Sequence, residues 1–198
     1  MNGIEIFLLE LGTSWMWSKI LVYIFLLLFF FLLALQLQRI IIINKFWRIA
    51  VVILVTILPV NIYFLFHPIY TGDIYDQALD TKSKYTFPET KTLSIFTLKG
   101  CPHCKNTIPY MEKLHLRNDQ ISIRYVIVGT KDSKNPGFTN EIPVFCQKVY
   151  VNKPLEIGDV TQGSYPCFVL SQHGKAEKRW FNDGFGMRTM DEIESYFE

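Results

Sequence analysis

The sequence predicts an α/β domain with a central mixed sheet flanked by helices, preceded by two transmembrane α-helices. Two observations support this prediction. Hydrophobic residues make up 49% of the chain, and most of them lie in two long runs within its first third. The rest of the chain alternates short apolar runs with helical patterns and turn residues, as α/β domains do.

The two apolar runs are long enough to cross a bilayer. The first, residues 17–37, has Lys19 as its single charge, and as a helix it spans about 30 Å of hydrocarbon. The second, residues 46–66, contains Pro59 late in the run, where a kink or local unwinding is tolerable. A cleavable signal peptide is the alternative for the first run, but this run exceeds the usual h-region and no small-residue cleavage site follows it. We therefore expect residues 1–66 to form a membrane anchor.

Positive charges predict the orientation of this anchor. The connection between the runs contains Arg39 and Lys45, and Arg48 follows, whereas the tail before Trp17 has no Lys or Arg. Loops rich in Lys and Arg stay in the cytosol. The C-terminal domain is then expected outside the cytosol, in a periplasm or an equivalent oxidising space, and the predicted location is a bacterial inner membrane.

Residues 67–91 are polar and are predicted to be a linker. Its 25 residues would let the following domain sample a radius of about 30 Å by random-coil scaling. Residues 92–198 then form one domain of ordinary size.

The elements of this domain follow from hydrophobic period and turn residues. They are a strand at 93–98, a helix from 101 to about 116, a strand at 121–128, a loop at 131–137, an irregular helix at 140–151, a hairpin of strands at 167–170 and 177–181, and a helix starting at 189. The first three make a βαβ unit with parallel strands. Pro109 should kink the first helix. Thr189 is the expected N-cap of the last helix, with Glu192 completing a capping box.

The tetrapeptide Cys101-Pro102-His103-Cys104 follows the first strand directly. Two cysteines at this spacing can close a disulfide if the backbone turns as the first turn of a helix does. A helix start favours the thiolate of Cys101, which would attack a partner, and Cys104 would resolve the mixed disulfide. His103 could lower the pKa of the Cys101 thiol through a hydrogen bond or positive charge. Its alternative is a solvated residue at the helix start.

This order of elements, with Cys-x-x-Cys at the first helix start, resembles the thioredoxin superfamily over about residues 92–198. A second mark is Tyr165-Pro166 before the third strand, where the superfamily carries a cis-proline loop facing the redox cysteines. The segment around the motif is similar to glutaredoxin-like members, and Cys-Pro-His-Cys is similar to the active site of DsbA-type dithiol oxidases. The resemblance implies thiol–disulfide exchange by Cys101 and Cys104, with Pro102, Tyr165 and Pro166 facing the substrate.

Two positions depart from the pattern of thioredoxin proper. Gly100 stands where a Trp usually precedes the first cysteine, and Ile95 stands where a buried carboxylate is expected. No nearby acid is therefore evident to carry the proton of the resolving cysteine.

The remaining cysteines, Cys146 and Cys167, leave two interpretations open. Lone cysteines of this kind are mostly small core residues, and the alternative is a second disulfide or relay between them. A four-cysteine zinc site would need a second closely spaced pair, so no metal is expected. The net charge of +2, without a basic cluster, argues against nucleic acid as a partner.

The function predicted from the sequence is a membrane-anchored thiol–disulfide oxidoreductase that acts on protein cysteines outside the cytosol. Its partners would be cysteine-containing proteins and a membrane redox partner, and its redox-active disulfide would serve without a further cofactor. The alternative is a non-catalytic membrane assembly or binding protein whose cysteines are structural.

Overall fold

The computed structural model describes residues 2–40, 44–79, 83, 85–129, 137–152 and 157–198. The chain divides into two compact units, Met1–Tyr70 and Thr71–Glu198.

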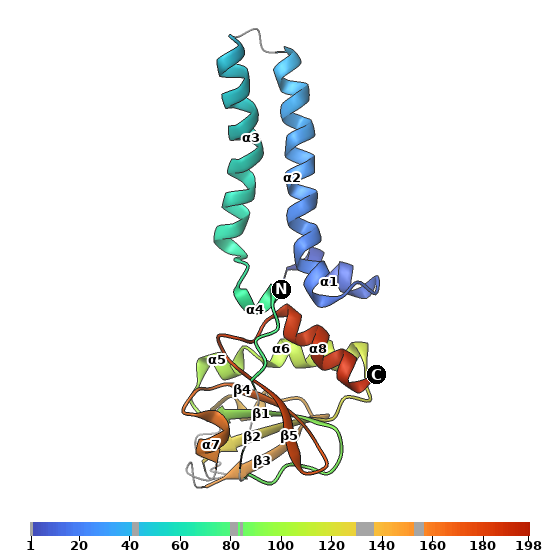
Figure 1. The fold of residues 1–198 in the computed structure, drawn as a ribbon, viewed down its shortest axis with the longest axis vertical. Coiled ribbons are helices and arrows are strands. Elements are labelled where there is room, and N and C mark those ends of the chain that lie inside the picture. Colours follow the sequence, from blue (N-terminus) through green and yellow to red (C-terminus); the bar gives the residue numbers. More distant parts are fainter. Residues whose placement is uncertain (1, 41–43, 80–82, 84, 130–136, 153–156) are drawn as a thin grey trace. The chain divides into compact units, whose positions relative to one another are not determined.

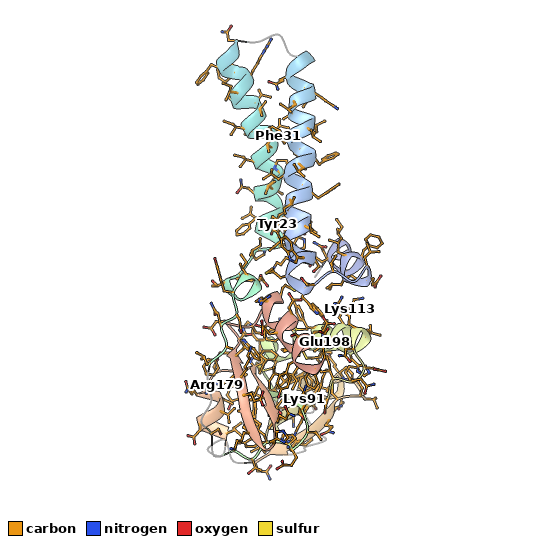
Figure 2. All side chains as sticks on the ribbon, turned by 45° about the vertical axis from the view of Figure 1, so that its right-hand side comes forward. Tyr23, Phe31, Lys91, Lys113, Arg179 and Glu198 are labelled. Atoms are coloured by element: carbon orange, nitrogen blue, oxygen red, sulfur yellow. A yellow bond between two sulfur atoms is a disulfide. The ribbon has the colours of Figure 1, made fainter. Side chains whose placement is uncertain are left out.

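The first unit contains helices α1 (Gly3–Glu10), α2 (Trp15–Ile40) and α3 (Lys45–Phe66). Both predicted apolar runs are helical, and by length and composition Trp15–Gln38 and Phe46–Phe66 could cross a membrane. Helices α2 and α3 lie side by side (Figure 1), and many of their large apolar side chains are exposed, among them Phe31, which is labelled in Figure 2. Helix α3 continues through Pro59.

Helix α1 was not predicted from the sequence, and it is held by its cap. The Asn2 side chain accepts a hydrogen bond from the Glu5 N–H at 2.8 Å, and the Glu5 carboxylate accepts one from the Asn2 N–H at 2.9 Å. This reciprocal capping box satisfies two N–H groups of the first turn. Asn2 also hydrogen-bonds Tyr63 near the end of α3, which ties the cap to the helix pair.

The second unit is built on a five-stranded sheet in the order β3-β2-β1-β4-β5. Its strands are β1 (Thr92–Leu98), β2 (Ile123–Val128), β3 (Gln147–Val151), β4 (Cys167–Gln172) and β5 (Lys175–Phe181). Strands β1, β2 and β3 are parallel to one another, whereas β4 is antiparallel to both β1 and β5. The predicted mixed sheet, with its βαβ unit and its C-terminal hairpin, is confirmed.

Helices cover both faces of this sheet (Figure 1). Helices α6 (Ile108–Arg117) and α8 (Met187–Phe197) lie on one face, where Phe168 stacks on Phe185 with ring centroids 3.6 Å apart. On the other face, Val160 of α7 (Gly158–Thr161) belongs to a buried apolar cluster with Phe96 and Cys167. This arrangement is a thioredoxin-like fold, as the resemblance implied.

The predicted first helix of the domain is in fact two helices, α5 (Pro102–Lys105) and α6, separated at Asn106 and Thr107. Pro109 lies in the first turn of α6 and has no N–H to offer the carbonyl of Lys105. The chain therefore forms two separate helices near this proline, whereas one kinked helix was predicted.

The predicted irregular helix at 140–151 is wrong. A short 3₁₀ helix, η1 (Gly137–Asn140), is followed by strand β3. Strand β3 is an edge strand with the sequence Gln-Lys-Val-Tyr-Val, rich in β-branched and aromatic residues, and its polar Gln147 and Lys148 are exposed. Residues 131–136 of the predicted loop lie outside the described residues.

The predicted cap of the last helix is also wrong. Helix α8 begins at Met187 with Gly186 as its N-cap, so Thr189 is already inside it. The Met187 N–H donates to Asp73 Oδ1 at 3.0 Å, so a distant carboxylate takes the role expected of Thr189.

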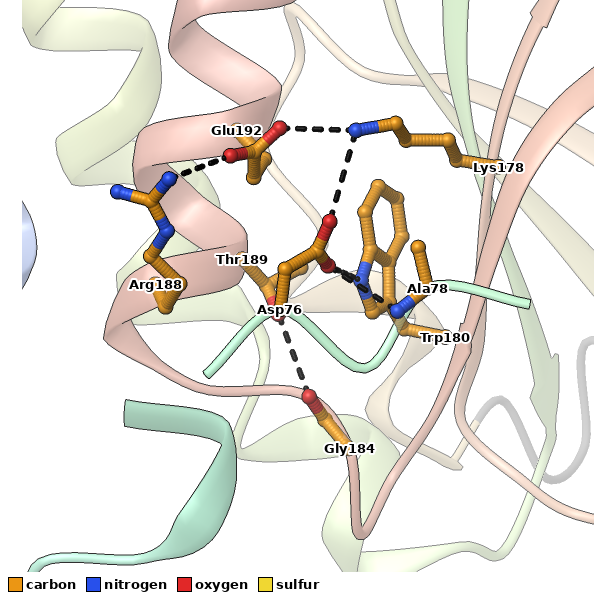
Figure 3. Close-up of polar contacts among 8 residues, drawn as sticks. All are labelled: Asp76, Ala78, Lys178, Trp180, Gly184, Arg188, Thr189 and Glu192. Carbon is orange, nitrogen blue, oxygen red and sulfur yellow. Dashed lines mark hydrogen bonds and ion pairs between the residues drawn. The ribbon is translucent and has the colours of Figure 1, made fainter. Parts of the chain in front are cut away.

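Asp73 belongs to the segment that was predicted as a linker, of which Thr71 onward lies in the second unit. This segment contains α4 (Thr71–Ile74), and its Leu79 pairs with Arg179 of β5 through N–H···O bonds of 2.8 and 3.1 Å. Asp76 accepts a hydrogen bond from Trp180 Nε1 at 2.7 Å (Figure 3). These contacts hold residues 71–79 of the predicted linker against β5 and α8.

Candidate active site at the start of α5

The structure joins Cys101 and Cys104 in a disulfide, with Cα atoms 5.2 Å apart. Cys101 is the N-cap of α5, and its extended backbone (φ −80°, ψ 113°) turns the chain from the end of β1 into the helix. Pro102 takes the first helical position, where its fixed φ suits a helix and its missing N–H costs no hydrogen bond. The sequence therefore builds the tight turn that the disulfide needs.

The two sulfur atoms have different surroundings. Cys101 is half-buried, whereas Cys104 is completely buried. The backbone N–H of Cys104 donates to Cys101 Sγ at 3.1 Å. A donor at this position would stabilise a thiolate on Cys101 when the pair is reduced, because a hydrogen bond to the charged form favours it. The accessible sulfur is thus the one suited to attack.

His103 lies between the two cysteines on α5, and its side chain is exposed. Its neighbour Lys105 forms an ion pair with Glu141 at 2.8 Å, with both side chains about half exposed. This pair links α5 to the segment that follows η1. The predicted effect of His103 on Cys101 stays a prediction.

The cis peptide bond implied for Tyr165–Pro166 is confirmed. Cys167 directly follows it and pairs with Phe96 of β1, so the loop lies at the end of the sheet where β1 leads toward Cys101. Pro166 is buried, and the half-buried Tyr165 packs against the apolar cluster near α7. The predicted substrate-facing residues and the disulfide therefore lie at the same end of the sheet.

The structure does not pair Cys146 with Cys167, because both are free and buried. Cys146 directly precedes β3, and Cys167 begins β4, so β2 and β1 lie between them. Three spacings between neighbouring strands amount to about 14 Å, which no disulfide spans. Burial raises the pKa of both thiols to about 12. Both therefore fit the interpretation of small core residues.

Thr107 and Tyr125 are the site residues that sequence reasoning missed. The Thr107 hydroxyl donates to the carbonyl oxygen of Cys104 at 2.8 Å and lies 2.9 Å from the Tyr125 hydroxyl. The spacing of Thr107, three residues after Cys104, is a signal for such a bond to the backbone. Tyr125 has no comparable signal, because it is one of several apolar or aromatic residues in its strand.

Within the described residues, no three or more His, Cys, Asp or Glu side chains gather where they could hold a metal ion.

Similar architectures occur among solved structures of bacterial proteins. One is the thioredoxin domain of a thiol-disulfide oxidoreductase from Bacteroides vulgatus, with 16% identity and a TM-score of 0.47 over 56% of this chain and 81% of that one. A secreted disulfide oxidoreductase of Mycobacterium tuberculosis, homologous to Escherichia coli DsbE, has 11% identity and a TM-score of 0.44 over 55% and 82%. StoA from Bacillus subtilis has 16% identity and a TM-score of 0.42 over 54% and 84%.

No protein-family model matches the chain, and no curated protein matches it in sequence.

Proposed function

We propose that this protein is a membrane-anchored thiol–disulfide oxidoreductase that acts on protein cysteines outside the cytosol. One observation carries the proposal. A disulfide at a helix start joins an accessible sulfur, which receives a backbone N–H, to a completely buried one. This asymmetry suits a pair in which one cysteine meets the partner and the other resolves the intermediate.

Exchange by this pair needs no further oxidant within a single cycle. With the pair reduced, the Cys101 thiolate attacks a substrate disulfide and displaces one substrate sulfur as a thiolate. Cys104, as its thiolate, then attacks Cys101 Sγ, the mixed disulfide breaks, and the second substrate sulfur leaves. The substrate gains two electrons and the Cys101–Cys104 disulfide forms. The reverse sequence oxidises a substrate dithiol, and a membrane redox partner would restore the starting state.

The neighbouring residues are proposed to tune and shape this exchange. His103 would stabilise the Cys101 thiolate, which stabilises the reduced form and makes the disulfide more oxidising. Pro102 and Tyr165 would form the surface that meets the substrate backbone, and the buried Pro166 would shape the loop that carries Tyr165. The pair itself carries the electrons, so the proposal includes no cofactor.

The two apolar helices are proposed to anchor the protein in a bacterial inner membrane, with the second unit in the periplasm. The length and composition of α2 and α3 support the anchor, and the basic connection at residues 39–48 supports the orientation. Protease added to right-side-out membrane vesicles should then digest the second unit. Digestion only in inverted vesicles would contradict the orientation.

The activity is tested by insulin reduction and by oxidation of a reduced protein substrate, using the full chain in detergent. Cys101→Ser should reduce exchange to the uncatalysed rate, because it removes the attacking sulfur. Cys167→Ala is the matched control, because it also removes a sulfur and should leave exchange within about twofold of the unsubstituted rate. Equal activity of Cys101→Ser and the unsubstituted chain would contradict the assignment.

The same variants separate an enzyme from a binding protein. If a Cys101→Ser/Cys104→Ser chain restored full function in cells, the domain would act by binding, with structural cysteines. The proposed enzyme predicts that this double variant fails while remaining folded and membrane-bound.

A further inference from the structure

A short chain of buried hydrogen bonds connects the resolving cysteine to the centre of the sheet. The Thr107 hydroxyl is 2.8 Å from the carbonyl oxygen of Cys104 and 2.9 Å from the hydroxyl of Tyr125. Tyr125 lies in β2, where it pairs with Ile95 of the central strand β1. Thr107 and Tyr125 are only 5% and 0% exposed, so water does not compete for these bonds.

The direction of each hydrogen bond follows from the number of protons. A carbonyl oxygen can only accept, so Thr107 donates its single hydroxyl proton to Cys104. The Thr107 oxygen must then accept, and Tyr125 must donate. Burial raises the pKa of Tyr125, which keeps its phenol protonated and able to donate. The Tyr125 hydroxyl therefore donates to Thr107, and the Thr107 hydroxyl donates to the carbonyl of Cys104.

This series of hydrogen bonds ends at the break between α5 and α6. Helix α5 ends at Lys105 and α6 begins at Ile108, so Cys104 lies in a single short turn. Its carbonyl accepts from Thr107 twice, from the backbone N–H at 3.3 Å and from the hydroxyl at 2.8 Å. A four-residue helix has little stability of its own. The fixed point for this turn is therefore Thr107, which Tyr125 holds to the sheet.

We propose that Thr107 and Tyr125 are positioning residues for the resolving cysteine. They hold the turn at Cys104 so that its sulfur lies within reach of Cys101 Sγ when a mixed disulfide forms. This inference rests on the proposed exchange function. It also explains how Cys104 is held in a chain that has Ile95 at the position where the thioredoxin pattern carries a buried acid.

The step that depends on this position is the second half of exchange. The Cys104 thiolate attacks Cys101 Sγ, the bond between Cys101 and the partner sulfur breaks, and the partner leaves as a thiolate. No other oxidant or reductant takes part. Attack by Cys101 on the first disulfide does not use the Cys104 sulfur and depends on this turn only through the Cys104 N–H beside Cys101 Sγ. A positioning role therefore predicts a much larger effect on the second step than on the first.

The two steps can be separated with the reduced full chain in detergent and an aromatic disulfide whose thiolate is coloured. The first coloured thiolate reports attack by Cys101, and the second reports resolution by Cys104. Thr107→Val and Tyr125→Phe should each slow resolution about tenfold and leave the first step within about twofold, because only resolution depends on where the Cys104 sulfur lies. Thr107→Ser keeps a hydroxyl and should resolve at nearly the unsubstituted rate.

Tyr196→Phe is the matched control for the loss of a phenol. Its hydroxyl contacts Gln172, at the other end of β4 from Cys167, so both steps should stay unchanged. Equal slowing of both steps in Tyr125→Phe would show a general structural effect and would overturn the inference. Resolution at the unsubstituted rate in both Tyr125→Phe and Thr107→Val would also overturn it.

A second readout does not require the protein to act on protein substrates. The equilibrium between the Cys101–Cys104 disulfide and dithiothreitol measures how well the two sulfurs are placed for ring closure. Tyr125→Phe and Thr107→Val should shift this equilibrium about tenfold toward the dithiol, equivalent to about 30 mV. An unshifted equilibrium would contradict positioning. If the unsubstituted chain did not exchange disulfides with protein substrates but the two variants still showed this shift, the proposed function would be contradicted. The positioning role would remain.

Discussion

Cys101 and Cys104 differ in access to solvent, and the backbone at α5 produces this difference. The cap position leaves Cys101 half-buried beside the N–H of Cys104, and the first turn carries Cys104 into the core. The tetrapeptide alone predicted the turn and the pair. It did not predict that Tyr125 takes part in the hydrogen bonds at Cys104, because Tyr125 lies 21 residues further along the sequence in an ordinary strand pattern.

In contrast to Cys101, Cys146 and Cys167 are thiols whose burial disfavours ionisation. Burial raises the pKa of each to about 12, from an unfolded value of about 8.5. Between these values the folded chain keeps protons that the unfolded chain releases. Because the folded state then binds more protons, its free energy of unfolding falls as the pH rises, by up to about 1.4 kcal/mol per pH unit for each thiol.

This pH dependence can be measured by denaturant unfolding of the oxidised full chain at about pH 8 and about pH 10. The free energy of unfolding should fall more for the unsubstituted chain than for Cys146→Ala/Cys167→Ala, since the variant lacks both groups. The difference between the two chains removes the contribution of other titrating residues. An equal fall in both would show that the two thiols ionise as easily in the folded state as in the unfolded state.

At the scale of elements, the segment from Thr71 to Leu79 completes the second unit. Its Asp73 accepts from the first N–H of α8, and its Leu79 pairs with β5. A Cβ atom on Gly72 would lie 2.6 Å from the carbonyl oxygen of Gly184, so glycine permits this close approach. The segment therefore forms one isolated bridge with β5 and supplies the carboxylate that caps α8.

Asp76 joins this segment to β5 and α8 through several contacts (Figure 3). It accepts from Trp180 Nε1 at 2.7 Å and lies 3.5 Å from Lys178 Nζ, which also contacts Glu192 at 2.8 Å. Glu192 makes the largest contribution to raising the pKa of Lys178, and Asp76 adds to it, so the lysine stays charged. Asp76→Ala leaves the buried Trp180 N–H without this acceptor and should destabilise the second unit by about 1–3 kcal/mol.

The stability of Asp76→Ala can be followed in the full chain by the reaction of the two free thiols, Cys146 and Cys167, with a thiol reagent during thermal unfolding. Both thiols are buried and become accessible only as the unit unfolds. Asp119→Ala removes an exposed carboxylate whose contact is to its neighbour Gln120, and it should change stability by less than about 0.5 kcal/mol. Equal melting of both variants would show that the segment does not stabilise the domain.

The elements that sequence reasoning predicted correctly are those with strong local signals. The strands β1, β2 and β4 carry clear apolar patterns, and the more polar β5 was predicted from the turn that joins it to β4. Their topology followed from the βαβ unit and the hairpin. Strand β3 was missed because Pro143 and the polar start of the strand hide an edge strand of only five residues. The true start of α8 was missed because its capping carboxylate, Asp73, comes from a segment 114 residues away.

At the scale of the whole molecule, the chain combines an apolar helical unit with a thioredoxin-like unit. Composition alone predicted this division, because the two apolar runs and the mixed domain occupy separate parts of the sequence. The boundary could not be placed from composition, since the polar residues after Tyr70 read as linker although they pack on the second unit. For the proposed function, a tethered domain of this kind would meet substrates close to the membrane.

The central claim is that Cys101 exchanges disulfides with protein cysteines, and it is tested most directly by trapping the mixed disulfide. The full chain carrying Cys104→Ser is expressed in cells, which are quenched in acid, alkylated and analysed on non-reducing gels. Because Cys104 is then absent, Cys101 should accumulate in adducts with substrate proteins that disappear on reduction. Cys101→Ser/Cys104→Ser should form none of these adducts. The same pattern in both variants, or no reducible adducts with Cys104→Ser, would contradict the account.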